Sequence, residues 1–195
     1  MPAKRPAPRL PAVPEEAMTA AQRELYDAIR SGPRGRVSGG GPFATWLHAP
    51  AFGQHAQRLG AHVRYHTALS PRLSEFAILV TARLWRAHYE WFAHEPHAAK
   101  AGISAATIAD LRAGRVPKRA AKDERAIHDF IREVYKNKRV SNRTYARVHA
   151  FLGDGGMVEL VGILGYYAMI SMTLNVFRML PPADAKLPFG DEKGG

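Results

Sequence analysis

The 195-residue sequence contains no cysteine. This absence excludes disulfides and thiolate metal ligands, and it excludes peroxidase or disulfide-exchange mechanisms in which a thiolate is the reacting species. A chain without cysteine also fits a reducing compartment, so we expect a cytoplasmic protein. Candidate chemistry therefore rests on acidic and basic side chains.

The sequence also lacks a long uninterrupted hydrophobic run. Its first twenty residues carry five prolines and no apolar stretch of signal-peptide length, which predicts a flexible N-terminal arm over residues 1–18. The segment closest to membrane length, Met157 to Leu180, contains Glu159, Asn175 and Arg178. Because unpartnered polar groups are rare in spanning helices, we interpret this segment as a buried central helix and expect no membrane association.

Convincing β alternation is missing as well, and apolar residues recur at helical spacing along most of the chain. Residues typical of helix starts stand at four positions: Thr19, Ser70, Ser104 and Ser141. The pattern predicts an all-α fold with a single domain over residues 19–180 and an extended C-terminal tail over residues 181–195.

Glycine and proline predict three interruptions of this helical pattern. The stretch SGPRGRVSGGGPF lacks the Gly-Lys-Ser/Thr ending of a phosphate-binding loop, and we interpret it as a flexible loop that folds over a pocket. Pro96 predicts a kink or an early end in its helix. The glycines at 153, 155 and 156 predict a break before the long apolar helix.

The formal net charge is +11, and ten Lys and Arg against four Asp and Glu lie between Lys118 and Arg147. Nucleic-acid binding calls for basic residues interleaved with aromatic ones or a recognisable motif, and neither is evident. We therefore expect a solvated basic face, no nucleic-acid partner, and attraction of anionic substrates as a further possibility.

The stretch from Ser70 to Gly102 holds the densest set of groups able to carry out acid–base chemistry. Glu90 and His94 are four residues apart, which on a helix places them about 40° apart in projection and roughly 6 Å along the axis. A carboxylate in this position orients an imidazole and favours its protonated form, which suits general acid–base catalysis. The alternative is a surface ion pair that contributes only a few tenths of a kcal/mol.

Glu75 stands early in a second helix whose neighbours Phe76, Ile78 and Leu79 leave little polar surface. A buried carboxylate needs a partner or takes up a proton, so Glu75 is a candidate site residue. A structural role near the free amides of the first helical turn is the alternative.

Three stretches carry a family resemblance: Leu69 to Leu111, the run MVELVGILGYYAMISMTLNVF, and the segment LYDAIRSGPRG…GPF…LHAP. They resemble the carboxymuconolactone decarboxylase family, part of the superfamily that includes the alkylhydroperoxidase D-like proteins. The resemblance extends from about Thr19 to Pro182. It implies an all-helical bundle of about seven or eight helices that assembles as a homo-oligomer, a trimer or a hexamer.

The thiol-dependent branch of that superfamily has a glutamate twelve residues before the first cysteine of a Cys-x-x-Cys pair and a histidine four residues after the second. Glu75 and His94 match the glutamate and the histidine, whereas Ala87 and Glu90 stand at the cysteine positions. The resemblance therefore implies that the proton-relay residues are kept while both redox residues are missing, which argues against thiol peroxidase activity.

The resulting hypothesis is a cofactor-free lyase, such as a decarboxylase, or an isomerase that acts on a small organic acid or lactone. His94 would move the proton while Glu75 or Glu90 sets its charge state. Departing carboxylate or enolate charge would need a donor, for which Arg83 and Tyr89 are candidates.

Two other hypotheses stay open at this point. One is a zinc or iron site built on Glu90 and His94 with a third ligand from Glu75, His88 or His97, although the usual two-histidine helical signature is missing. The other is a non-enzymatic oligomer that binds a small apolar ligand or a partner. Five aromatic residues either line a pocket or pack the core: Trp46, Trp85, Trp91, Tyr166 and Tyr167.

Overall fold

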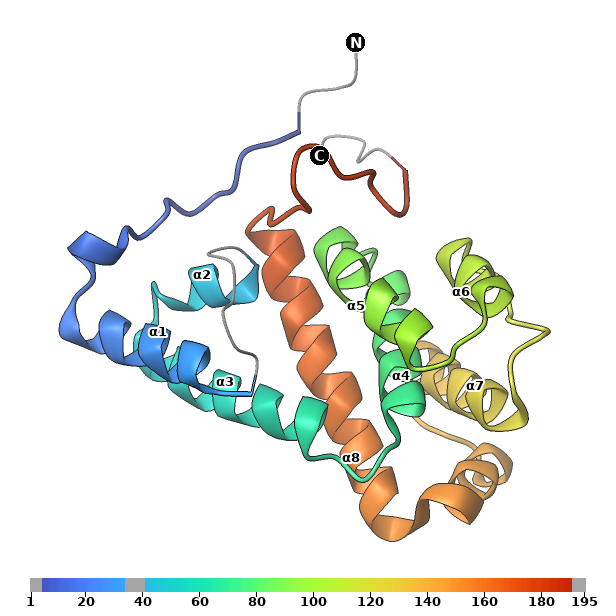
Figure 1. Ribbon diagram of the computed structural model, residues 1–195. Coiled ribbons are helices and arrows are strands. Elements are labelled where there is room, and N and C mark those ends of the chain that lie inside the picture. Colours follow the sequence, from blue (N-terminus) through green and yellow to red (C-terminus); the bar gives the residue numbers. More distant parts are fainter. Residues whose placement is uncertain (1–4, 34–40, 191–195) are drawn as a thin grey trace.

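The computed structural model describes residues 5–33 and 41–190 (Figure 1). Within these ranges the chain forms eight α helices and one short 3-10 helix, and no residue lies in a β strand. The elements are η1 (Glu15–Ala17), α1 (Ala20–Ser31), α2 (Pro42–Trp46), α3 (Pro50–Tyr65), α4 (Pro71–Leu84), α5 (His88–Lys100), α6 (Ala105–Arg112), α7 (Lys122–Asn137) and α8 (Asn142–Val176). The predicted all-α fold is confirmed.

Local capping explains where several helices begin. Thr19 forms a reciprocal capping box with Gln22 at the start of α1, and three serines accept a hydrogen bond from a backbone N–H in the first turn of their helix: Ser70, Ser104 and Ser141. Each cap satisfies a backbone donor that has no partner inside the helix. These four helix starts agree with the starts predicted from the sequence.

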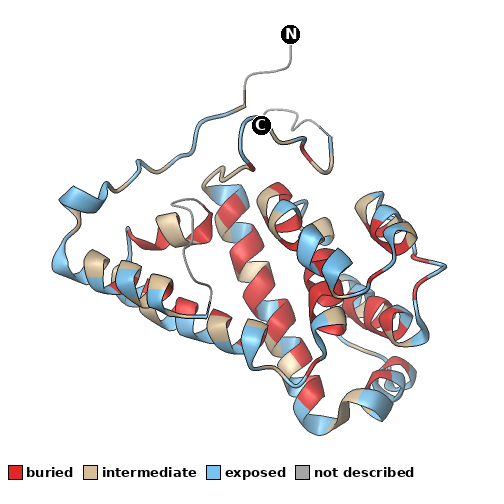
Figure 2. Cartoon of the chain, in the orientation of Figure 1, coloured by how far each residue is buried: buried red, intermediate tan, exposed pale blue. Residues whose placement is uncertain are grey.

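Helix α4 forms the centre of the bundle. All ten residues from Leu73 to Ala82 are buried, and the helix packs against α5, α7 and α8. Burial on every side explains why its sequence is apolar nearly all round. Figure 2 shows the buried positions gathered on α4, α7 and the inward side of α8. The one carboxylate inside this buried stretch is that of Glu75.

Helix α8 is bent at Gly153, whose φ of 64° and ψ of −176° are not helical. A positive φ is readily adopted only by glycine, which explains the break predicted at this point. Beyond the bend the helix runs through the middle of the molecule, with α1 and α3 on one side and α4 and α5 on the other (Figure 1). It is long and apolar enough to cross a membrane, but it packs here as a core helix against α3, α4, α5 and α7.

The N-terminal arm and the C-terminal tail lie against each other (Figure 1). The backbone N–H of Arg9 donates to the carbonyl of Phe177 at 3.0 Å, and the guanidinium of Arg5 donates to the carbonyl of Pro181 at 3.0 Å. Further along the tail, the ring of Phe189 contacts His88 and Trp91. These contacts place the two terminal segments side by side at one end of the bundle.

Of the two effects predicted at Pro96, a kink or an early end, the early end is wrong, because α5 continues through this residue to Lys100. Proline removes the hydrogen bond to the carbonyl of Phe92, and both residues are exposed, so water can solvate that carbonyl. Most of the predicted glycine-rich loop, residues 34–40, lies outside the described residues.

Candidate active site

Glu75, Glu90 and His94 form a buried triad between α4 and α5. Nδ1 of His94 lies 2.7 Å from Oε2 of Glu75, and Nε2 of the same ring lies 3.0 Å from Oε1 of Glu90. The exposed fractions are 3% for His94, 4% for Glu90 and 8% for Glu75. The structure therefore brings together the three residues singled out in the sequence, with the imidazole held between two carboxylates.

The connection between the two helices positions this triad. Helix α4 ends at Leu84, and the chain turns within three residues, with Arg86 in the left-handed region at a φ of 51°. Helix α5 then packs directly against α4. Glu75 approaches His94 from across this packed pair, whereas Glu90 approaches from one turn earlier on the same helix.

Burial by itself would lower the pKa of His94, but the negative charges of Glu90 and Glu75 and hydrogen bonds to both raise it to about 9. Burial likewise acts to raise the pKa of Glu75. The hydrogen bond to His94 and the positive charges of His94 and Arg64 outweigh it, and the pKa of Glu75 is lowered. At neutral pH the ring is an imidazolium that donates from both nitrogens.

A small cavity of about 70 Å³ opens beside this triad. Its walls come from four helices: Pro42 and Phe43 of α2, Arg64 of α3, Tyr89, Glu90, Ala93 and His94 of α5, and Tyr166, Tyr167 and Ile170 of α8. Glu75 is not among the lining residues, so it lies behind His94 as seen from the cavity. A molecule in the cavity would meet Glu90 and His94 directly and Glu75 only through His94.

Arg64 is a site residue that the sequence did not reveal. Its guanidinium lies over the ring of Tyr65 at 5.4 Å from the ring centroid, and it forms no hydrogen bond or ion pair with any residue in the described ranges. A cation that lines a cavity without an ionic partner suits an anionic ligand. No motif relates α3 to the acid–base stretch, so this placement follows from helix packing alone.

Tyr166 and Tyr167 also line the cavity, although both are buried. The ring of Tyr167 meets that of His94 edge to face at a centroid distance of 5.2 Å. Burial and the charge of Glu90 raise the pKa of Tyr167 well above its ordinary value, so the phenol keeps its proton. The three tryptophans, in contrast, are not among the residues that line this cavity: Trp46, Trp85 and Trp91.

The two proposed substrate-binding residues are placed differently. Tyr89 lines the cavity, and its ring lies so close to Gly41 that a Cβ at Gly41 would be 2.9 Å from it. Arg83 is directed elsewhere, because its Nε donates to the carbonyl of Arg112 at 2.8 Å and its guanidinium stacks over Phe189. The structure thus brings Tyr89 to the site and does not bring Arg83 there.

The metal hypothesis finds no ligand set within the described ranges, where no group of three or more His, Asp or Glu side chains is arranged to hold an ion. Both nitrogens of His94 face carboxylates, and an imidazolium has no lone pair for a metal. His88 is buried against Phe189, and His97 is exposed with its ring 6.1 Å from that of His94.

A solved structure, one of several that match, resembles the chain over nearly its whole length. It is a crystal structure described as an alkylhydroperoxidase AhpD core, an uncharacterized peroxidase-related protein from Ralstonia eutropha, with a TM-score of 0.74 and 16% sequence identity. The match covers 95% of this chain and 96% of that one. The likeness shows that the chain has the AhpD-like helical fold. No protein-family model and no curated protein sequence matches the chain.

Proposed function

We propose that this protein is a cofactor-free acid–base enzyme, a lyase or an isomerase, that acts on a small organic acid or lactone. The observation that supports the proposal is the Glu75–His94–Glu90 triad, buried beside a cavity that is also lined by Arg64, a cation without an ionic partner among the described residues. The structural relative is described as peroxidase-related, but a thiol peroxidase needs cysteine and this chain has none.

Proton transfer would run through Glu90. Because His94 is already protonated at neutral pH, the group able to accept a proton at the cavity is the Glu90 carboxylate. In an isomerisation, Glu90 takes a proton from the carbon beside a carbonyl and returns it to another carbon. In a decarboxylation, the bond to the carboxylate breaks, carbon dioxide leaves, and the enolate carbon takes a proton that His94 supplies through Glu90.

The remaining cavity residues fit an anionic substrate. Arg64 would hold its carboxylate or the developing enolate oxygen, and the protonated phenol of Tyr167 adds a donor. A cavity of about 70 Å³ is smaller than the ~150 Å³ cavity known to hold benzene, so it accommodates only the reacting end of a substrate. The net charge of +11 would attract such acids from solution.

Replacement of Glu90 tests this proposal. Glu90→Gln keeps the size of the side chain and removes the base, so we expect turnover to fall at least about 100-fold, the usual contribution of a positioned acid–base group. Wild type and variant would be screened on lactones and keto acids for release of carbon dioxide and for uptake of deuterium from solvent.

Glu124→Gln is the matched control. Glu124 is buried to the same 4% exposure but pairs with Arg72 outside the cavity, so its replacement should lower stability and leave turnover within about twofold. Full turnover in a folded Glu90→Gln protein would contradict the proposal. A wild-type protein that turns over none of these acids would favour the non-enzymatic alternative.

A further inference from the structure

A second, larger cavity lies on the other side of α2. Its volume is about 390 Å³, and it is bordered by the N-terminal arm, α1, α2 and the segment that follows α8; we call it the arm chamber. The wall is mainly apolar, with contributions from Leu10 and Val13 of the arm, Ile29 of α1, Phe43 of α2, Leu47 directly after α2, and Met179.

The arm is a fixed wall of this chamber. Its backbone is bonded to the end of the bundle at Arg9, which donates to the carbonyl of Phe177, and at its other end η1 is joined to α1. There the carboxylate of Glu15 accepts a hydrogen bond from Tyr26 and pairs with Arg23 at 3.4 Å. The arm, which forms the outer wall of the chamber, is therefore attached to the domain at both of its ends.

The polar groups in the wall indicate a neutral ligand. The two charged lining residues, Glu15 and Arg30, pair with each other at 3.5 Å, and Nη1 of Arg30 donates to the hydroxyl of Tyr26 at 2.6 Å. No charge in the wall is left without a partner, so an ionic ligand would gain no new ion pair and would lose its hydration.

Thr45 is the exception among these polar groups. It lines the chamber, it is more than nine-tenths buried, and its hydroxyl oxygen has no hydrogen-bond partner among the described residues. A buried hydroxyl without a partner is costly, so it indicates a bonding group that is supplied from elsewhere. One hydroxyl or carbonyl on a ligand would satisfy it once rotation about the Cα–Cβ bond turns the hydroxyl of Thr45 toward the chamber.

Size and polarity together favour a small molecule over a peptide segment as the occupant. A peptide brings one N–H and one C=O per residue, whereas the side chains of the chamber wall include a single buried hydroxyl without a partner among the described residues, that of Thr45. Its volume falls within the range of small-molecule pockets. By proportion with the ~150 Å³ cavity that holds benzene, it accommodates about sixteen non-hydrogen atoms.

We propose that the arm chamber binds a neutral, mainly hydrocarbon molecule with one hydroxyl or carbonyl group. The site does not depend on the proposed catalytic function, because neither Glu90 nor His94 lines it. Phe43 lines both this chamber and the catalytic cavity, so an occupant would lie next to the wall of the catalytic site.

Binding of the neutral dye phenylnaphthylamine, whose fluorescence rises in apolar surroundings, tests the proposal. We expect one saturable site on the wild type. Ala44→Phe, which fills the chamber from α2, should weaken binding at least about tenfold, and Ala12→Phe should do the same from the exposed arm, where it does not disturb the core. Ala106→Phe on the distant α6 is the matched control and should bind as the wild type does.

Competition against the dye tests the polarity of the ligand. Dodecanol should displace it at a lower concentration than dodecanoate, and Thr45→Val should reduce this displacement by dodecanol. Unchanged dye affinity in both folded chamber variants, no dye binding to the wild type, or stronger displacement by dodecanoate would each overturn the proposal. His94→Gln should bind the dye with the affinity of the wild type. Failure of the proposed catalytic function would therefore not affect the proposal that the chamber binds a ligand.

Discussion

His94 lies between two carboxylates and is almost completely removed from water, and these two facts act in opposite directions. Burial disfavours the imidazolium, whereas Glu90 and Glu75 favour it and raise the pKa of His94 to about 9. The ring is therefore charged when the protein works at neutral pH. In the reaction we propose, His94 would act as the proton store and Glu90 as the group that exchanges protons with the substrate.

This charge state makes stability depend on pH. A group whose pKa is raised on folding contributes stability that is complete below its unfolded pKa, near 6.5, and is lost as the pH rises through about 9. Relative to His94→Gln, we expect the wild type to lose at most about 3 kcal/mol of unfolding free energy between pH 6.5 and about pH 10. Urea unfolding at a series of pH values measures this difference.

His149→Gln provides the control for this measurement. His149 is 40% exposed and pairs at 2.7 Å with the nearly fully exposed Asp154, so its replacement should leave the pH profile parallel to that of the wild type. The opposite sign of slope, with the wild type gaining stability relative to His94→Gln above pH 6.5, would show that His94 is neutral in the folded protein.

The sequence predicts part of this site because part of it is local. Glu90 and His94 meet through the geometry of one helix turn, and that spacing is visible in the chain. Arg64 is missed because only the packing of α3 brings it to the cavity. Arg83 stands eight residues after Glu75, which on a helix is about 80° round and about 12 Å further along the axis, so it cannot share the site of Glu75.

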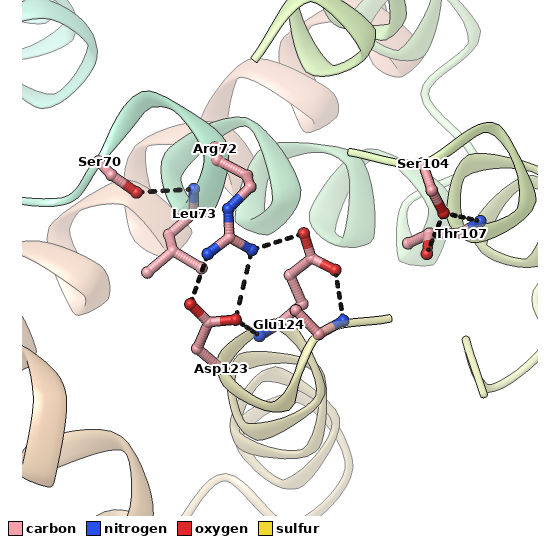
Figure 3. A network of polar contacts seen from close by, with 8 residues as sticks. Ser70, Arg72, Leu73, Ser104, Thr107, Asp123 and Glu124 are labelled. Carbon is pink, nitrogen blue, oxygen red and sulfur yellow. Dashed lines mark hydrogen bonds and ion pairs between the residues drawn. The ribbon is translucent and has the colours of Figure 1, made fainter. Parts of the chain in front are cut away.

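At the scale of helices, the start of α4 is attached to the start of α7 (Figure 3). Nη1 of Arg72 lies 2.7 Å from Glu124, and Nη2 lies 2.5 Å from Asp123. Oε2 of Glu124 in turn accepts from the backbone N–H of Ala121 at 2.9 Å. Glu75 follows Arg72 by one helical turn, so this network fixes the end of the helix that carries a triad residue.

Removal of the guanidinium should therefore destabilise the bundle. Arg72→Met leaves Glu124 buried without its charged partner, and we expect a loss of about 2 kcal/mol at pH 7. Arg72 also lowers the pKa of Asp123, so this loss should shrink as the pH falls through that lowered pKa and the carboxylate is protonated. Chemical denaturation at pH 7 and at about pH 3 measures both effects.

Arg115→Met is the matched control for Arg72→Met. Arg115 pairs with Asp110 at 2.8 Å, but its side chain is 62% exposed, so we expect a cost below about 0.5 kcal/mol. If both variants lost the same unfolding free energy, the burial of Glu124 would not determine how much the Arg72 network contributes to stability.

Helix boundaries follow the same division between local and long-range causes. The starts at Ser70, Ser104 and Ser141 are set by side chains next to the boundary, and the sequence predicts them. The continuation of α5 through Pro96 depends on packing against α4 and α6, which compensates for one lost hydrogen bond. Local preference alone predicts a boundary there, and tertiary contacts override it.

At the scale of the whole molecule, the surface of α8 is unusual. Four large apolar residues on its second half are exposed: Val158 at 73%, Val161 at 57%, Met172 at 44% and Val176 at 51%. With the exposed Gly165 they follow a spacing of mostly three and four residues, so they lie along one face. A stripe of exposed apolar residues along one face of a helix is typical of a contact between protein surfaces. The family resemblance implies homo-oligomers, and we propose that this face joins copies of the chain.

Val161→Glu tests that assembly. A charge in the middle of the stripe would be buried without a partner in an oligomer, so we expect the variant to sediment as a monomer at concentrations where the wild type sediments as a trimer or a hexamer. Val116 has the same 57% exposure in the segment between α6 and α7, and Val116→Glu should sediment as the wild type does. A monomeric wild type would show that the stripe does not join copies. An assembled Val161→Glu protein would show the same, because a buried interface cannot accept an unpaired carboxylate without loss of affinity.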